Sequence, residues 1–291
     1  MANLKEIRSR ITSVSSTMQI TNAMKMVSAA KLNRAQEAIT AMRPYADKLT
    51  ELLQDLSSSS DGATGAFSTE REVNRLLIVA ISSNRGLAGA FNANIVKEVR
   101  RLVEEEYAGK EVALITLGKK ANDVLRKTTT IQHNNTEIFD ALKFDDVADI
   151  ADDIMKDFVE EKYDKVLFVY NSFVNAATQI VTTEQFLPII SKEEEEAEQE
   201  ETGSEVDYIY EPDKDEIVAE LIPKSLKIQL YKALRDSVAS EHGARMTAMH
   251  KATDNAADLK AELTLSYNKA RQAAITNEIL EIVGGAEALN G

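Results

Sequence analysis

Hydrophobic residues recur at alternating intervals of three and four positions near both ends of the chain. The N-terminal stripe comprises Leu4, Ile7, Ile11, Val14 and Met18, and it resumes between Ala35 and Leu56. The C-terminal stripe extends from Leu226 through Leu259 to Ala274 and contains many alanines. This spacing is that of a coiled-coil seam, and alanines in a seam let two helices approach closely. Between Met18 and Ala35 the apolar residues change phase through Met24 and Val27, and the stripe then resumes.

The helix-breaking residues support two long helices. Residues 1–61 contain no glycine and one proline, Pro44, whereas residues 224–283 contain no proline and one glycine, Gly243. Glycine costs about 1 kcal/mol and proline about 3 kcal/mol inside a helix, so their scarcity over such lengths is meaningful. We predict helices over residues 1–57 and 224–291, roughly 80 and 95 Å long at about 1.5 Å per residue. We expect them to pair antiparallel, with a bend at Pro44.

The middle of the chain has a different pattern. Residues 75–81, 111–116 and 165–171 are short, nearly continuous apolar runs of the kind found in strands that are buried on both faces. A further strand is predicted over residues 179–184, and helical patterns lie between the runs. The predicted fold is therefore a small Rossmann-like α/β domain, residues 58–223, inserted between the two helices of an antiparallel coiled coil.

Charge and composition exclude several classes of function. The 291 residues carry a net charge of −14, and most of the acidity lies in residues 58–223. So acidic a chain is a poor partner for nucleic acid. Cysteine is absent and only three histidines are present, which excludes disulfides and metal sites built on thiolates or histidines. The Glu-rich stretch at 192–205 is predicted to be a solvated loop.

No part of the sequence predicts insertion into a membrane. No apolar stretch approaches the roughly 18–20 residues that a membrane-spanning helix needs. The N-terminus is basic but lacks the apolar core of a secretory signal and the length of an organelle import leader. We therefore expect the chain to begin inside the compartment in which it works.

The candidate chemistry is weak. Residues 83–90 (SNRGLAGA) follow a predicted strand, but Gly86 and Gly89 do not complete a phosphate-binding motif, so a strand-to-helix turn is favoured. His242 and His250 are eight residues apart and point about 80° apart on a helix, which disfavours a shared metal. No carboxylate lies in a motif that would set an acid opposite a base. We expect no catalytic site, no cofactor and no metal.

Two segments of the predicted helices are apolar or small nearly all round. These are residues 21–30 (TNAMKMVSAA) and 273–286 (AAITNEILEIVGGA). A helix that is apolar all round is normally buried, and no other part of the chain can cover these two segments. Another protein is therefore expected to cover them.

Five segments spread over the whole chain resemble one protein family. They are ITNAMKMVSAAKL (20–32), SSNRGLAGAFNANI (82–95), DYIYEPD (207–213), SEHGARMTAMHKATDNA (240–256) and LSYNKARQAAITNEILEIVGGAEAL (265–289). They resemble the gamma subunit of bacterial rotary ATP synthase. The resemblance implies a non-catalytic rotor shaft that couples proton flow through the membrane sector to ATP synthesis or hydrolysis at sites on beta.

The resemblance also implies partners and a location. The paired helices would stand inside a hexamer of alternating alpha and beta subunits, and the α/β domain would sit with an epsilon subunit on a ring of c subunits. The complex would lie at the cytoplasmic face of the bacterial inner membrane, with this chain peripheral to it.

Matching motif to motif, the resemblance implies two sets of contact residues. The set expected to meet beta, with the first helix facing the last, comprises Met24, Lys25, Arg245, Arg271, Gln272 and Thr276. The set expected to rest on the c ring comprises Tyr208 and Glu211. The competing interpretations are a solvated helix face for the first set and a capping turn for the second.

Two other functions stay open from the sequence. One is an enzyme that binds a nucleotide on its α/β domain, and the other is a coiled-coil tether that is stable without partners. The apolar helix tips count against the tether, and the incomplete glycine motif counts against the enzyme.

Overall fold

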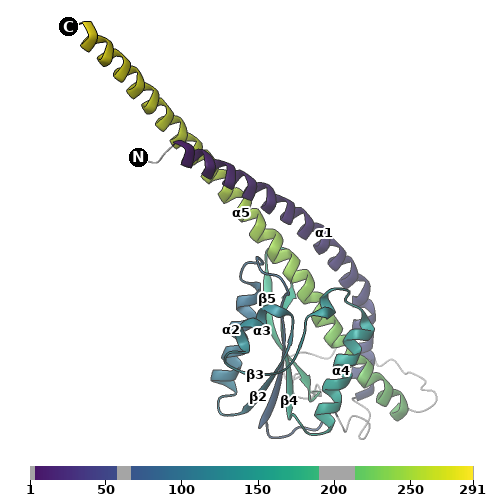
Figure 1. The fold of residues 1–291 in the computed structure, drawn as a ribbon. Coiled ribbons are helices and arrows are strands. Elements are labelled where there is room, and N and C mark those ends of the chain that lie inside the picture. The colour runs from purple at the N-terminus through teal and green to yellow at the C-terminus, as the bar shows by residue number, and fades with distance from the viewer. Residues whose placement is uncertain (1–3, 58–66, 190–213, 291) are drawn as a thin grey trace, which may run out of the picture. The chain divides into compact units, whose positions relative to one another are not determined.

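The computed structural model describes residues 4–57, 67–189 and 214–290. The chain divides into two compact units. Residues Met1–Ala29 and Arg245–Gly291 form one, the two-helix unit, and residues Ala30–Ala244 form the other, the sheet unit. Two long helices, α1 (Leu4–Ser57) and α5 (Lys214–Asn290), contribute to both units (Figure 1).

Both long helices continue through a proline. Helix α1 passes Pro44 without ending, and α5 begins at Lys214 instead of residue 224, so that Pro223 lies inside it. Ile222 and Leu226, on either side of Pro223, are buried in the core of the sheet unit. Each such side chain contributes about 1.5–3 kcal/mol on burial, which offsets the roughly 3 kcal/mol that an interior proline costs.

The sheet unit contains a five-stranded mixed sheet in the order β3-β2-β1-β4-β5. Strands β1 (Arg75–Ile81), β2 (Glu111–Leu117), β3 (Thr130–Asn135) and β4 (Lys165–Phe173) are parallel, and β5 (Gln179–Leu187) pairs antiparallel with β4. The sequence predicts all of these strands except β3. That strand reads TIQHNN and lies mostly exposed at a sheet edge, so it carries no apolar run.

Helices cover both faces of the sheet (Figure 1). Helices α2 (Phe91–Arg101) and α3 (Lys119–Leu125) pack on one face, and α4 (Phe144–Val159) packs with part of α5 on the other. Short turns of helix occupy Leu102–Glu106 and Glu137–Phe139. Alternate residues of the central strand β1 serve the two faces, because successive strand residues point in opposite directions.

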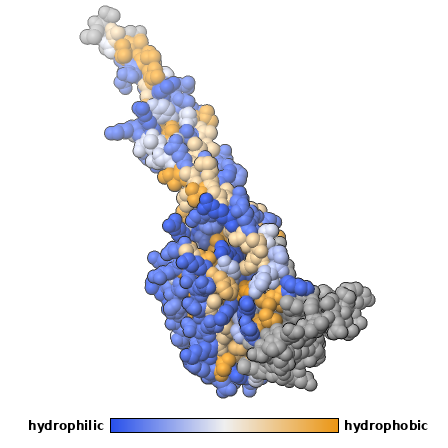
Figure 2. Space-filling model, turned by 90° about the vertical axis from the view of Figure 1, so that its right-hand side faces the viewer, coloured by the Kyte–Doolittle hydropathy of each residue, from blue (hydrophilic) through white to orange (hydrophobic). Residues whose placement is uncertain are grey.

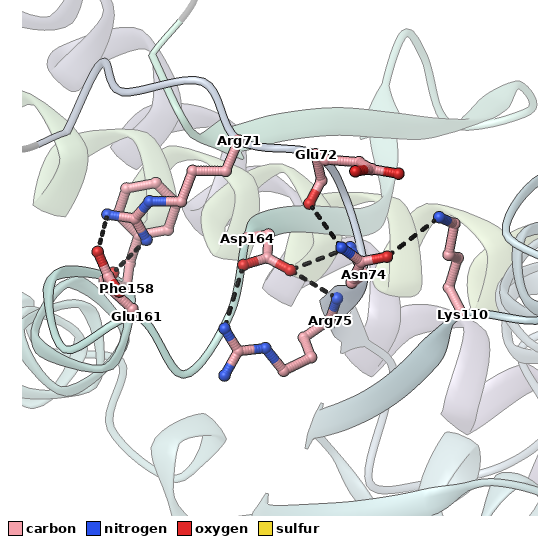
Figure 3. A network of polar contacts seen from close by, with 8 residues as sticks. All are labelled: Arg71, Glu72, Asn74, Arg75, Lys110, Phe158, Glu161 and Asp164. Carbon is pink, nitrogen blue, oxygen red and sulfur yellow. Dashed lines mark hydrogen bonds and ion pairs between the residues drawn. The ribbon is translucent and has the colours of Figure 1, made fainter.

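A buried carboxylate fixes the amino ends of β1 and β4 (Figure 3). Asp164 is 5% exposed and accepts hydrogen bonds from the backbone N–H groups of Asn74 (3.0 Å) and Arg75 (2.8 Å). The Arg75 guanidinium approaches it at 3.3 Å. Burial by itself would raise the pKa of Asp164, but these donors and the Arg75 charge outweigh it and lower the pKa.

A second group in the same view holds the segment before β1 against the end of α4. The guanidinium of Arg71 donates to the carbonyl oxygen of Phe158 (3.3 Å), lies 5.1 Å from the centre of its ring and approaches Glu161 at 3.6 Å (Figure 3). Lys110 donates to the side chain of Asn74 at 3.3 Å. These contacts are structural, because each group is engaged by a neighbour that holds the strand ends together.

Polar contacts also attach α5 to the sheet. The Tyr170 hydroxyl donates to Glu184 (2.8 Å), and the amide of Gln229 on α5 donates to the same carboxylate (2.7 Å). Burial and the adjacent Glu184 carboxylate raise the pKa of Tyr170 well above its usual value, so its hydroxyl stays a donor. On α1, Ala46 and Leu49 pack against Ile228 of α5, so the long helices also meet in the sheet unit.

Candidate functional site

The seam of the two-helix unit keeps its phase along α1. The residues that are at least partly covered follow the three-four spacing through Ile11, Val14 and Met18 and then continue to Thr21, Lys25 and Ser28. The apolar residues change phase between Met18 and Ala35, but the covered stripe of α1 does not. Apolar residues leave the stripe there, but the side chains of Thr21 and Ser28 occupy the buried positions instead.

The facing stripe of α5 also differs from the prediction at one position. Leu259, expected in the seam, is 46% exposed. Lys260 is partly covered in its place, and the covered series goes on through Leu263, Tyr267 and Ala270. Around the helix Leu259 lies about 60° from Ala256 and about 40° from Leu263, on the opposite side of the stripe from Lys260.

Contacts between side chains set the register of the two helices. The hydroxyl oxygens of Thr21 and Thr253 lie 2.8 Å apart, and Lys260 Nζ lies 3.3 Å from Ser15 Oγ. The two pairs step in opposite directions along the two helices, so α1 and α5 are antiparallel, as predicted (Figure 1).

This register separates the residues that the resemblance assigns to beta. It brings Met24 and Lys25 to the level of His250, so they lie about 8 Å along the axis from Arg245. Arg271 lies about 30 Å from the level of Met24 and His250, measured along α5 at about 1.5 Å per residue. The residues therefore form two neighbourhoods along the helix pair, one with Met24, Lys25 and Arg245 and the other around Arg271. Met24 and Lys25 do not face the Arg271 group across the helix pair, although the resemblance implied that they would.

The second neighbourhood is on a single helix. Arg271, Gln272 and Thr276 are exposed, and the Thr276 hydroxyl donates to the Gln272 carbonyl at 2.9 Å. The register brings the first described residue of α1, Leu4, to the level of Arg271. Within the described residues, α5 continues beyond that level without α1 beside it. Contact of these residues with beta stays a prediction, as it does for the first neighbourhood.

The residues predicted to rest on the c ring, Tyr208 and Glu211, lie outside the described residues. The Glu-rich stretch 192–205 lies outside them too.

Large apolar side chains are exposed on the two-helix unit away from the seam (Figure 2). Those on α1 flank the buried hydroxyls of Thr21 and Ser28, and those on α5 lie mostly in its last described turns. They comprise Ile20, Met26, Val27, Leu265, Ile275, Ile279, Leu280, Ile282 and Val283, each 48–66% exposed. In residues 20–28 the usual order is thus inverted, with hydroxyls inside and hydrocarbon outside. Exposed apolar surface of this kind marks a protein-binding site.

The strand-to-helix turn at 83–90 is engaged in holding its own shape. Ser83 donates to the Arg85 carbonyl (2.7 Å), and Asn92 accepts from the Ser83 backbone (3.0 Å). At Gly118, φ is +108°, and an added Cβ would lie 2.2 Å from the Ser82 carbonyl oxygen. These contacts accord with the turn that the sequence favours, since both side chains bond within the turn and its following helix.

In the described part of the chain, no group of three or more His, Cys, Asp or Glu residues is arranged to hold a metal ion. No helix in that part is both long and apolar enough to cross a lipid bilayer.

An α/β domain inserted between two long helices with apolar outer surfaces defines a protein-binding subunit of a larger assembly. A family model described as ATP synthase matches residues 3–289. The chain is 65% identical to the ATP synthase gamma chain of Christiangramia forsetii and 64% identical to that of Flavobacterium johnsoniae, each over 292 residues and 100% of both chains. The chain belongs to the ATP synthase gamma chain family.

Solved structures share the fold. A chain of the Tetrahymena thermophila mitochondrial ATP synthase central stalk and c-ring is 25% identical, with a TM-score of 0.61 over 80% of this chain and 99% of that one. A chain of the Euglena gracilis OSCP/F1/c-ring assembly has a TM-score of 0.68 at 22% identity, over 98% and 94%.

The family membership confirms the class of function that the sequence predicts. The chain is a gamma subunit of ATP synthase, a part of the central stalk rotor and not a catalytic subunit. The predicted fold class, two terminal helices in a coiled coil with an inserted α/β domain, is confirmed as well.

Proposed function

We propose that this chain turns inside a hexamer of alternating alpha and beta subunits and couples proton flow to ATP synthesis or hydrolysis on beta. The observation that carries the proposal is the exposed hydrocarbon at the end of α5, from Ile275 to Val283. Such a surface is unfavourable in water and becomes favourable inside a close-fitting sleeve of protein.

The membrane-side partners are part of the same proposal. The Tetrahymena and Euglena assemblies that share this fold contain a c-ring, and we infer that the sheet unit here meets a c-ring and an epsilon subunit. Tyr208 and Glu211 are the residues proposed to rest on the ring. The chain would then be peripheral to the bacterial inner membrane, on its cytoplasmic face.

Asymmetry is what lets such a shaft drive catalysis. Two helices have no threefold symmetry, so each of three equivalent beta subunits meets a different face of the pair. Different contacts give different free energies, which bias the three sites toward different states. Rotation exchanges the faces and therefore exchanges the states.

The same surface must also release its contacts with beta at each step of rotation. Exposed ion pairs contribute only about 0–1 kcal/mol, so a contact through Arg271 would hold and release without a large barrier. Aliphatic residues such as Ile279 and Ile282 add few directional bonds that rotation would have to break. We therefore propose Arg271, Gln272 and Thr276 as a catch for a beta loop, with Met24, Lys25 and Arg245 as contacts farther down.

The test compares ATP hydrolysis with proton pumping in inverted membrane vesicles that contain the whole complex. Arg271→Ala and Gln272→Ala are expected to lower the protons pumped per ATP hydrolysed at equal amounts of assembled complex. Asn277→Ala, also exposed on the same stretch of α5, is the matched control. Unchanged coupling in both variants would remove the catch assignment, and assembly of a complex that pumps normally without this chain would remove the proposed function.

A further inference from the structure

A pair of threonine hydroxyls joins the two helices in the middle of their seam. Thr21 Oγ1 and Thr253 Oγ1 lie 2.8 Å apart, and Thr21 is only 9% exposed. Each hydroxyl also reaches a carbonyl on its own helix, Thr21 to Met18 at 3.1 Å and Thr253 to Met249 at 2.8 Å.

Counting protons shows that the bond between the helices persists in two arrangements. Two hydroxyls supply two protons for three contacts. Thr21 donates across while Thr253 donates to Met249, or Thr253 donates across while Thr21 donates to Met18. In both arrangements one proton bridges the helices and the other stays within one helix.

The apolar side chains next to the pair resist sliding only weakly. Near the pair the seam presents small residues such as Ala252 and Ala256, and the apolar stripe repeats every seven residues, so a shift of one heptad meets similar neighbours. The same shift would bring Thr21 opposite Met246 or Lys260, and neither offers a threonine hydroxyl. A buried polar pair in a coiled coil is known to specify register for this reason.

We propose that Thr21 and Thr253 form a register lock, a pair of positioning residues that fixes the axial alignment of α1 and α5. The proposal deepens the rotor function, because a two-helix shaft that transmits torque must not let one helix slip along the other. The register itself is a property of this chain and is measured independently of rotation.

The two proton arrangements predict an unusual pattern in variants. In Thr21→Val the Thr253 hydroxyl still donates to Met249, and in Thr253→Val the Thr21 hydroxyl still donates to Met18. Neither single variant leaves a buried hydroxyl without a partner, yet both lose the bond between the helices. The two single variants and the double variant should therefore have the same effect on register, which is the signature of a pair that acts as one unit.

The chain supplies matched controls. Thr17 donates to the Ser13 carbonyl (3.0 Å) and Thr264 to the Lys260 carbonyl (2.7 Å), and both are exposed. Thr17→Val and Thr264→Val remove a threonine hydroxyl of the same kind from each helix without touching the seam. They separate loss of the lock from a general effect of valine on helix stability.

The experiment measures the distance between spin labels on the two helices, in the full chain and in the assembled complex. Ser9→Cys and Lys251→Cys are both at exposed positions, and the chain has no other cysteine. The parent protein should give one narrow distance. Each lock variant and the double variant should give the same additional population, displaced along the axis by about 10 Å for a slip of one heptad.

Three results would overturn the lock. They are a single unchanged distance in all lock variants of the full chain, a double variant that slips by the sum of the single effects, and slippage of equal size in the control variants. A chain that slips as expected while pumping in the complex stays normal would instead count against the rotor role, and the register result would stand.

Discussion

The two units of this protein are built on opposite plans. In the sheet unit, six of the seven residues of β1 are buried, and apolar clusters fill the space on both faces of the sheet. In the two-helix unit the buried positions include Thr21 and Ser28, while Ile20 and Val27 are exposed. One unit places its hydrocarbon inside, and the other places much of it outside.

The difference separates what holds the chain together from what it presents to partners. Burial of apolar area is the main source of folding free energy, so most of the stability resides in the sheet unit. The two-helix unit gains little from its small seam and leaves apolar surface for another protein to cover. Changes in the first unit should therefore affect unfolding, and changes in the second should affect assembly and coupling.

The largest effect is expected from opening the core of the sheet unit. Phe158 is fully buried, and Phe158→Ala should lower the free energy of unfolding by about 3–5 kcal/mol. Val159, the next residue of α4, is 47% exposed, and Val159→Ala should cost no more than about 0.5 kcal/mol. Urea unfolding followed by circular dichroism measures both, and equal losses would contradict the conclusion that buried apolar side chains such as Phe158 carry the stability of the sheet unit.

The buried carboxylate at the strand ends gives the next effect. Asp164→Asn should cost about 1–3 kcal/mol at neutral pH, because two backbone N–H groups and Arg75 lose the charge they face. The pKa of Asp164 is lowered by folding, so its contribution is present above the ordinary value of 3.8 and is lost as the pH falls through the folded-state pKa.

The difference in unfolding free energy between the parent protein and Asp164→Asn should therefore shrink as the pH is lowered from 7 to below 4. Unfolding titrations at a series of pH values measure it. A difference that is constant or grows toward acid would mean that the carboxylate is not stabilised by its donors.

A buried hydroxyl without a partner should yield a gain in stability. Among the described residues, Ser240 Oγ on α5 is a buried side-chain atom without a hydrogen bond. Ser240→Ala should stabilise the sheet unit by about 1 kcal/mol. Ser266 is exposed on the same helix, so Ser266→Ala reports the difference in helix propensity alone, about 0.5 kcal/mol. If the two gains are equal, burial of the Ser240 hydroxyl carries no cost.

The smallest effect on folding is expected on the apolar end of α5. Ile279→Ser and Leu280→Ser remove exposed side chains, so the free energy of unfolding should change by no more than about 0.5 kcal/mol. Recovery of the assembled complex from membranes should nevertheless fall, because the sleeve would lose apolar contact. Normal recovery with both substitutions together would show that this surface is not the one that partners cover.

The sequence predicts the elements whose signal is strong and local. Strands β1, β2 and β4 begin where the predicted apolar runs begin, because strands buried on both faces need hydrocarbon at nearly every position. Strand β5 also begins at the predicted residue, Gln179, although it is mostly exposed or half-buried at a sheet edge. Strand β3 is missed because an edge strand such as TIQHNN needs only backbone pairing with β2. The start of α5 is missed because tertiary burial of Ile222 and Leu226 overrides the local preference of Pro223.

The candidate site shows where apolar periodicity stops being informative. The hydrophobic residues alone lead through Met24 and Val27, out of phase with the stripe on either side. The seam is continuous because Thr21 and Ser28 bury their methyl or methylene groups while their hydroxyls bond to backbone carbonyls, Ser28 to Met24 at 2.8 Å. The residue types on the outside, not those on the inside, are the signal for a partner-binding helix pair.

Gly243 is the only glycine in residues 224–283 of the sequence. An added Cβ there would lie 3.2 Å from both Cα and the carbonyl oxygen of Ala176, on the loop between β4 and β5. Glycine costs the helix about 1 kcal/mol relative to alanine, but the space beside Ala176 is too small for the additional carbon atom of alanine. An inserted side chain would push the hairpin away from the helix by a few tenths of an ångström, so any redesign of the sheet unit has to preserve this close approach of one backbone to another.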